Sequence, residues 1–190
     1  MVKKLVFLLL AASLLFSCQS NKAIKRASKD GFMYAMIYDY DGTPVAGVAV
    51  HLNGRKTAES DVQGRFVLDR TNRGEYSVRL AKKGYETLEE KFHFDPTQVL
   101  YFKMIDAERL VNLAETALDG GDPSVAQDFL DRALALEPDR PDILYLKSIT
   151  LHFQGKNDEA VKTLEGLLKR GIARDAVIGL LETVQKARGG

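Results

Sequence analysis

Between residue 31 and about residue 105, apolar and polar positions alternate, and short clusters of turn residues interrupt the alternation. Val48, Val50 and Leu52, for example, share one face of an extended segment. Asn53-Gly54 follows at once, a pair that tolerates the positive φ of a tight turn. A period of two with frequent turns is typical of an all-β sandwich or barrel. We expect a seven-stranded antiparallel β-sandwich, with strands over residues 32–38, 48–52, 56–60, 66–68, 74–80, 88–94 and 100–104.

Around residue 106 the apolar period changes from 2 to about 3.6, which predicts amphipathic helices. The expected helices cover residues 107–118, 124–136, 142–153, 157–169 and 174–187. Glycines or prolines stand where several of them end. The fold class is therefore α+β, with a sandwich over residues 31–105 and helices over residues 106–190. Since almost no linker separates the two parts, we expect them to pack as one body.

The helical part repeats itself after 34 residues. The matching pairs are Leu110 and Leu144, Gly121 and Gly155, Ala126 and Ala160, Leu130 and Leu164, and Ala133 and Leu167. This period and the Ala126, Leu130, Ala133, Pro138 pattern resemble the tetratricopeptide repeat family. The second copy departs from the pattern at Leu167 and Ile172. The resemblance implies two repeats, and we expect the fifth helix to cap the second.

The sandwich segment also carries four short motifs rich in turn residues. They are Asp41-Gly42-Thr43-Pro44-Val45-Ala46-Gly47-Val48, Asp61-Val62-Gln63-Gly64-Arg65-Phe66, Gly74-Glu75-Tyr76-Ser77-Val78 and Lys83-Gly84-Tyr85. In this order they resemble the carboxypeptidase regulatory-like family, a transthyretin-like sandwich found as an accessory module on exported bacterial proteins. Glycines supply turn conformations and the apolar residues fill the space between sheets. These motifs therefore have structural roles, and none of them indicates reaction chemistry.

Residues 1–17 have the pattern of an export signal, with Lys3 and Lys4 ahead of a short apolar run. The run is shorter than the 20 or so residues of a spanning helix. Leu15-Phe16-Ser17-Cys18 resembles the bacterial lipobox, which implies a covalent lipid on Cys18 and a body in the bacterial cell envelope, held to the inner or outer membrane. The alternative is an ordinary signal peptide with an incidental thiol. Residues 18–30 are polar and we interpret them as a tether, whose basic residues could alternatively touch lipid headgroups.

Charge and residue content argue against several classes of function. Without Lys3 and Lys4, 25 basic residues face 26 acidic ones, so no basic field favours nucleic acid. The three histidines stand in different expected elements without a second ligand at metal spacing, and no catalytic or phosphate-binding motif occurs. Asp39, Asp41 and Asp61 lie in turns, where capping of the turn is favoured over calcium binding. We therefore predict a non-enzyme with no metal and no cofactor beyond the lipid.

In tetratricopeptide repeats the first helix of each repeat lines a groove, and the resemblance carries this role onto eight positions. They are Glu108, Val111, Glu115, Leu118, Asp142, Tyr145, Ile149 and His152. Tyr145 and Ile149 are the expected peptide anchors. The alternative is that these residues pack against the fifth helix or the sandwich.

From the predicted groove we expect a protein or peptide partner, and therefore a function as an adaptor. Val111 and Glu115 stand where chaperone-binding members have a lysine and an asparagine, so no clamp for a C-terminal carboxylate is expected. A second hypothesis is cell-wall or carbohydrate binding by the sandwich. With no tryptophan in the chain, Tyr38, Tyr40, Tyr85 or Tyr101 would have to stack on the sugar.

Overall fold

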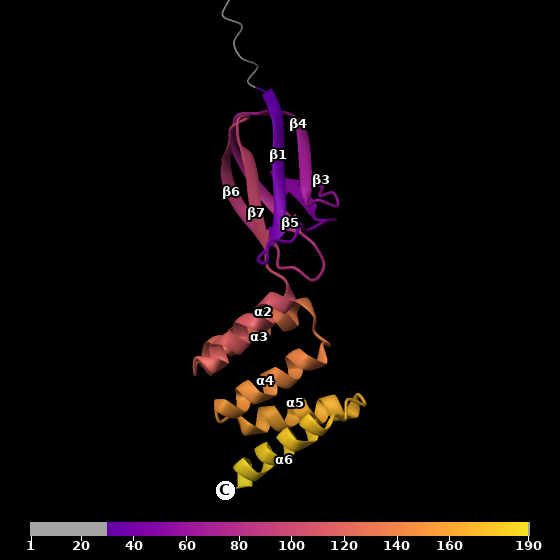
Figure 1. The fold of residues 1–190 in the computed structure, drawn as a ribbon, viewed down its shortest axis with the longest axis vertical. Coiled ribbons are helices and arrows are strands. Elements are labelled where there is room, and N and C mark those ends of the chain that lie inside the picture. Colours follow the sequence, from indigo (N-terminus) through magenta and orange to yellow (C-terminus); the bar gives the residue numbers. More distant parts are fainter. Residues whose placement is uncertain (1–29, 190) are drawn as a thin grey trace, which may run out of the picture.

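A computed structural model describes residues 30–189, in which a β-sandwich precedes five helices (Figure 1). The strands are β1 (Asp30–Asp39), β2 (Ala49–Leu52), β3 (Arg55–Glu59), β4 (Arg65–Asn72), β5 (Gly74–Ala81), β6 (Leu88–Phe94) and β7 (Val99–Met104). The helices are α2 (Ala107–Asp119), α3 (Pro123–Leu136), α4 (Pro141–Phe153), α5 (Asn157–Lys169) and α6 (Asp175–Gly189). The predicted fold class is confirmed. The export signal, Cys18 and the tether up to residue 29 lie outside the described residues.

Two sheets face each other in the sandwich, with strand orders β4-β1-β7 and β3-β2-β5-β6. Alternate residues point into the space between them, where Ile37, Leu80 and Phe94 are fully buried. The Phe66 and Phe102 rings stack there with centroids 6.3 Å apart. One detail differs from the expected antiparallel pattern, because β1 pairs with β7 in parallel and with β4 antiparallel. The alternation of residues within a strand is the same in either direction, so it does not reveal the pairing direction.

The aspartates of the sandwich turns bond to their own backbone. One carboxylate oxygen of Asp39 accepts from the N–H groups of Asp41 and Thr43, at 2.9 and 2.7 Å. Asp61 accepts from Gln63 N–H and Arg65 N–H, both at 2.9 Å. Gly64 completes this second turn at φ +72°, where an added Cβ would collide with the Ile37 carbonyl oxygen. These bonds agree with the interpretation of Asp39 and Asp61 as turn-capping residues.

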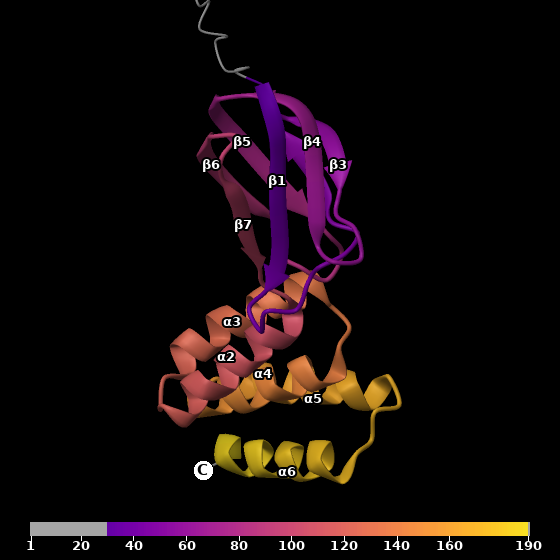
Figure 2. The ribbon, with the colours of Figure 1, turned by 45° about the horizontal axis from the view of Figure 1, so that its top comes forward.

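The five helices form a stack in which α4 packs on both sides (Figure 2). Its Ile143 belongs to the core shared with α2 and α3, whereas its Leu151 belongs to the core shared with α5 and α6. Buried Ser148 and Thr150 bond back to carbonyls one turn earlier, both at 2.9 Å, so their hydroxyls are satisfied inside the stack. None of the helices within residues 30–189 is long and apolar enough to cross a membrane.

The 34-residue repeat appears as repeated backbone geometry. Gly121 and Gly155 end α2 and α4 with φ values of +77° and +74°. The residue after each glycine donates its N–H to a carbonyl five residues back, Asp122 to Ala117 at 2.8 Å and Lys156 to Leu151 at 2.9 Å. Both first helices therefore turn into their second helices by the same capping motif.

Only Ile105 and Asp106 separate β7 from α2, and both parts of the molecule contact this join. The Asp106 carboxylate accepts from Arg109 N–H at 2.8 Å and thereby begins α2. On the sandwich side, Glu86 N–H donates to the Ile105 carbonyl at 2.9 Å. The Glu86 carboxylate accepts both Nε and Nη2 of Arg132 in α3, at 2.8 and 2.7 Å. The sandwich is thus connected to the helices by more than the chain itself.

Candidate binding surface of the helical repeats

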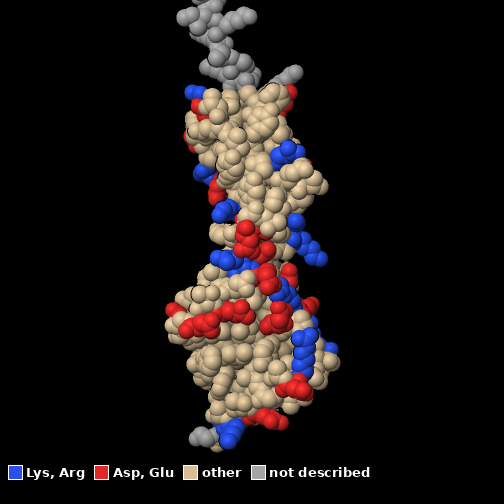
Figure 3. Space-filling model, viewed as in Figure 1, with Lys and Arg blue, Asp and Glu red and all other residues tan. Residues whose placement is uncertain are grey.

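The first helix, α2, exposes a polar face of acidic character. Glu108, Asn112, Glu115 and Asp119 are exposed and follow one another at intervals of three or four residues, which places them along one side of the helix. Figure 3 shows Asp and Glu side chains gathered where α2 and α3 lie, above a largely uncharged surface. This face offers carboxylates to a partner with basic side chains.

The corresponding face of α4 is less polar. Ile149 is half-buried and Phe153, four residues later, is 62% exposed. The His152 ring stacks beside Phe153 with centroids 6.2 Å apart, and its Nδ1 lies 2.8 Å from the amide oxygen of Asn157. An exposed ring next to a half-buried aliphatic side chain is the kind of feature that anchors a bound peptide.

Three of the predicted groove residues lie in the cores. Val111 is 7% exposed in the cluster between α2 and α3, and Leu118 packs against the same cluster. Tyr145 packs against the cluster that α4 forms with α5 and α6. Tyr145 thus packs toward the fifth helix, as the alternative stated, whereas Val111 and Leu118 pack toward α3, which neither interpretation predicted. Val111 in particular is not available to a partner.

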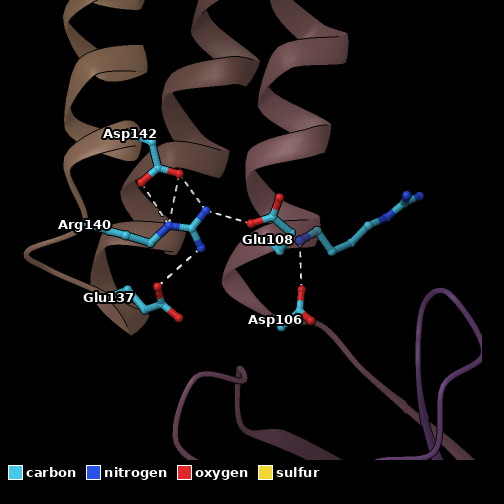
Figure 4. Close-up of polar contacts among 6 residues, drawn as sticks. Asp106, Glu108, Glu137, Arg140 and Asp142 are labelled. Atoms are coloured by element: carbon cyan, nitrogen blue, oxygen red, sulfur yellow. Dashed lines mark hydrogen bonds and ion pairs between the residues drawn. The ribbon is translucent and has the colours of Figure 1, made fainter. Parts of the chain in front are cut away.

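Two other predicted residues, Glu108 and Asp142, meet around Arg140 in an ionic cluster (Figure 4). Arg140 Nη2 lies 2.7 Å from carboxylate oxygens of both, and Nη1 lies 3.3 Å from Glu137 Oε2. The hydrogen bond from Arg140 lowers the pKa of the Asp142 carboxyl, and the three carboxylates together raise the pKa of Arg140 far above its usual value. The cluster links the beginnings of α2 and α4.

Arg140 was not predicted from the sequence, because it precedes α4 and one of its partners is 32 residues away. The available signal was the spacing of Glu137, Arg140 and Asp142 around a helix start. Glu108 and Asp142 are exposed but already share this guanidinium. Of the other predicted groove residues, Glu115 is exposed and Ile149 and His152 are half-buried, and the structure adds the exposed Phe153.

The tyrosines considered for sugar stacking separate into two groups. Tyr38 and Tyr101 line the outer face of the β4-β1-β7 sheet, together with Tyr34, which the sequence analysis did not select. Tyr40 lies near the join, with Lys103 Nζ 5.7 Å from its ring centroid. Tyr85 is half-buried and forms a bridge with Asp106, and burial raises the pKa of its hydroxyl. Regular alternation along β1 was the signal for Tyr34.

No group of three or more His, Cys, Asp or Glu side chains within residues 30–189 is placed to hold a metal ion. His93 and His152 lie in different parts of the molecule. His93 Nδ1 contacts Glu75 Oε1 at 2.7 Å on the sandwich, whereas His152 lies on α4.

Comparison with known proteins identifies the helical repeats. Residues 117–180 match the sequence model of the tetratricopeptide repeat family. A stretch of 63 residues is 41% identical to cellulose synthase operon protein C of Pseudomonas fluorescens (strain SBW25). It covers 33% of this chain but only 5% of that protein. The helical part thus contains tetratricopeptide-like repeats.

Two solved structures show weaker likeness. A streptococcal ancillary pilin aligns over 40% of this chain and 29% of its own, with a TM-score of 0.35 and 20% identity. The 3-chlorocatechol 1,2-dioxygenase of Rhodococcus opacus 1CP aligns over 42% of this chain and 61% of its own, with a TM-score of 0.29 and 15% identity. Neither value supports an argument about the sandwich, whose carboxypeptidase regulatory-like resemblance stays a prediction.

Proposed function

We propose, starting from the tetratricopeptide repeats, that this protein is a non-catalytic adaptor of the bacterial cell envelope that captures a partner protein on the first helices of its repeats. The family match over residues 117–180 supports a protein-interaction role. The bacterial origin of the similar protein agrees with a bacterial setting.

The observation that carries this proposal is the pairing of two exposed faces on successive first helices. The α2 face offers the Glu115 carboxylate, and the α4 face offers Ile149 and Phe153. A partner segment that fits both carries a basic residue near an apolar one. Electrostatic attraction speeds the encounter, and burial of the apolar side chain supplies affinity.

The proposal includes a lipid on Cys18, on the strength of the lipobox resemblance. β1 begins at residue 30, at the end of the sandwich that lies away from the helices (Figure 1). A lipid on Cys18 would therefore hold the sandwich nearest the membrane and present the helical repeats away from it. Two or more acyl chains suffice for stable anchoring.

The test is crosslinking and capture from native membranes with a Glu115→Lys, Phe153→Ala double variant. Both side chains are exposed, so the variant keeps the fold while it reverses the charge of the α2 face and removes the ring of the α4 face. The matched control is Glu165→Lys with Val125→Ala, which makes the same charge reversal and a smaller apolar truncation on the second helices α5 and α3.

Mass spectrometry of the captured proteins gives the readout, with quantities compared to the unchanged protein. We expect one stoichiometric partner that falls at least about tenfold with the double variant and stays constant with the control. Equal capture by both variants would contradict the proposal that the partner binds the first helices α2 and α4. Labelling of the same cells with an alkyne fatty acid, with and without Cys18→Ser, tests the lipid separately.

A further inference from the structure

The two outer faces of the sandwich differ in chemistry. The outer face of the β3-β2-β5-β6 sheet carries charged side chains, with Arg79 Nε 3.1 Å from Glu89 Oε1 and His93 paired to Glu75. The outer face of the β4-β1-β7 sheet is aromatic and aliphatic. Figure 3 shows this second face as a surface with few charged side chains.

The exposed apolar side chains of this second face come from all three strands. Tyr34 is 47% exposed on β1, and it pairs with Val67 of β4 and Val99 of β7, which are both 47% exposed. Tyr101, two residues after Val99, is 68% exposed. With Tyr38 these residues line a shallow depression of about 550 Å³. Exposed large apolar side chains gathered on one surface mark an interaction site.

The arrangement of the rings follows the strands. Tyr34 and Tyr38 are four residues apart on β1, so they point to the same side, and Tyr101 lies beside Met36 between them. Neighbouring positions on one face of a strand are about 6.6 Å apart. The three tyrosines therefore form a triangle, with two corners on β1 and one on β7, and each ring carries a hydroxyl.

The charge of the face restricts what can bind. Asp61 and Arg65 are the charged residues that line the depression, and they neutralise each other, with Arg65 Nε 2.9 Å from Asp61 Oδ2. Arg65 Nη2 also donates to Gln63 Oε1 at 2.7 Å. Lys103, at the margin, points its ammonium to the Tyr40 ring. The two charged residues that line the depression leave it with no net charge, and the single ammonium of Lys103 lies outside it. An anionic membrane or a polyanionic polymer therefore finds no cluster of positive charge in the depression, whereas a neutral ligand with apolar faces and hydroxyl groups matches both the rings and the polar margin.

We propose that the outer face of the β4-β1-β7 sheet binds a neutral glycan chain, which lies along the strands. Sugar rings stack on Tyr34 and Tyr101, while Arg65 donates hydrogen bonds to sugar hydroxyls, Asp61 accepts hydrogen bonds from them, and the tyrosine hydroxyls do either. This site is independent of the first helices that we propose for protein capture, so either proposal can fail without the other.

Affinity electrophoresis of the full chain in detergent tests the site, with hydroxyethyl cellulose in the gel as a neutral glucan and carboxymethyl cellulose as its anionic counterpart. The test variant is Tyr34→Ala with Tyr101→Ala, and Tyr→Phe at both positions keeps the rings. A control on the opposite face, Arg79→Ala with Lys91→Ala, removes exposed side chains of another chemistry. Both tyrosines are exposed, so the test variant keeps the fold, and circular dichroism checks this.

We expect the neutral glucan to retard the unchanged protein, and the two alanines to weaken binding about tenfold or more. The phenylalanine variant and the opposite-face control should stay within about threefold of the unchanged protein. Failure of the neutral glucan to retard the protein, equal or stronger retardation by carboxymethyl cellulose, or retardation that survives the two alanines would each overturn the proposal.

A second measurement tests whether a protein, and not a glycan, covers this face. With p-benzoylphenylalanine in place of Tyr101, irradiation of cells would attach a protein that covers this face. A single protein adduct of high yield would make the face a protein interface and contradict the glycan assignment, while no discrete protein adduct agrees with it.

Discussion

The sandwich and the helical repeats bury their apolar residues in different ways. The sandwich has one continuous core that both sheets share, with Phe66, Phe94 and Phe102 among its members. The helical part has two smaller cores, and α4 contributes residues to both. Ala114, Ala126 and Ala133 are fully buried in the first of them. Strand pairs such as Tyr34 with Val99 connect residues 65 positions apart, whereas each helix packs on its neighbours along the chain. We infer that a substitution in the sandwich core destabilises all of its strands, whereas a core substitution in the repeats destabilises only the helices next to it.

Removal of a central ring from the sandwich should give the largest effect. Phe94 is 0% exposed and its ring meets Tyr76 edge to face, with centroids 6.3 Å apart. Phe94→Ala should lower the free energy of unfolding by about 3–5 kcal/mol, because the cavity adds to the lost burial. Denaturant unfolding gives the value, and hydrogen exchange should show lost protection in all of β1 to β7 but not in α5 and α6. The exposed ring of Phe153 is the control, since its change to alanine should cost no more than about 0.5 kcal/mol.

Overpacking of the first helix pair should have an intermediate and local effect. Ala126 is 0% exposed in the core between α2 and α3, so the added atoms of Ala126→Leu force the helices apart at a cost of about 1–3 kcal/mol. Ala135→Leu on the exposed side of α3 should leave the stability nearly unchanged. Hydrogen exchange should increase in α2 and α3 and remain as before in the sandwich. Equal loss of protection in β1 to β7 would show that the two parts unfold together. It would contradict the inference that a core substitution in the repeats has only a local effect.

The smallest effect should come from the ion pair between the two parts. The bond from Arg132 lowers the pKa of the Glu86 carboxyl, so the pair stabilises the fold above the carboxyl's unfolded pKa of about 4.3. This contribution disappears as the pH falls through the lower folded pKa. Arg132→Gln should cost less than about 1 kcal/mol near neutral pH, because both side chains are partly exposed, and nothing once Glu86 is protonated in both states.

Unfolding curves from about pH 3 to 7 test this prediction. Arg79→Gln is the matched control, since Arg79 and Glu89 pair within the sandwich and are both more exposed. A pH-independent loss with Arg132→Gln would mean that Arg132 acts through packing on Phe129, whose ring lies 5.5 Å from its guanidinium carbon, and not through the charge of Glu86.

Most of the fold could be predicted from the pattern of apolar residues. The period of two predicted all seven strands, and the period of 3.6 with its capping glycines and prolines predicted all five helices to within a few residues. Gly121 and Gly155 adopt positive φ as their place after α2 and α4 suggested. These features are local, because alternation, turns and caps depend on residues a few positions apart.

The candidate surfaces were predicted less well. The family positions selected Val111 and Tyr145 as groove residues, but the contacts of α2 with α3 and of α4 with α5 and α6 decide which side of each helix is covered. Arg140 and Tyr34 were missed because their importance comes from neighbours on other elements, Glu108 for the first and Val67 and Val99 for the second.

The sequence by itself determined which segments are strands or helices, where they turn and which residues repeat after 34 positions, since short-range sterics and hydrogen bonding decide these properties. Only the tertiary structure decided that β1 pairs in parallel with β7, that Arg140 joins two helix starts, and that three tyrosines line one largely apolar sheet face. Each depends on residues far apart in the chain, and their proximity is set by the packing of whole elements.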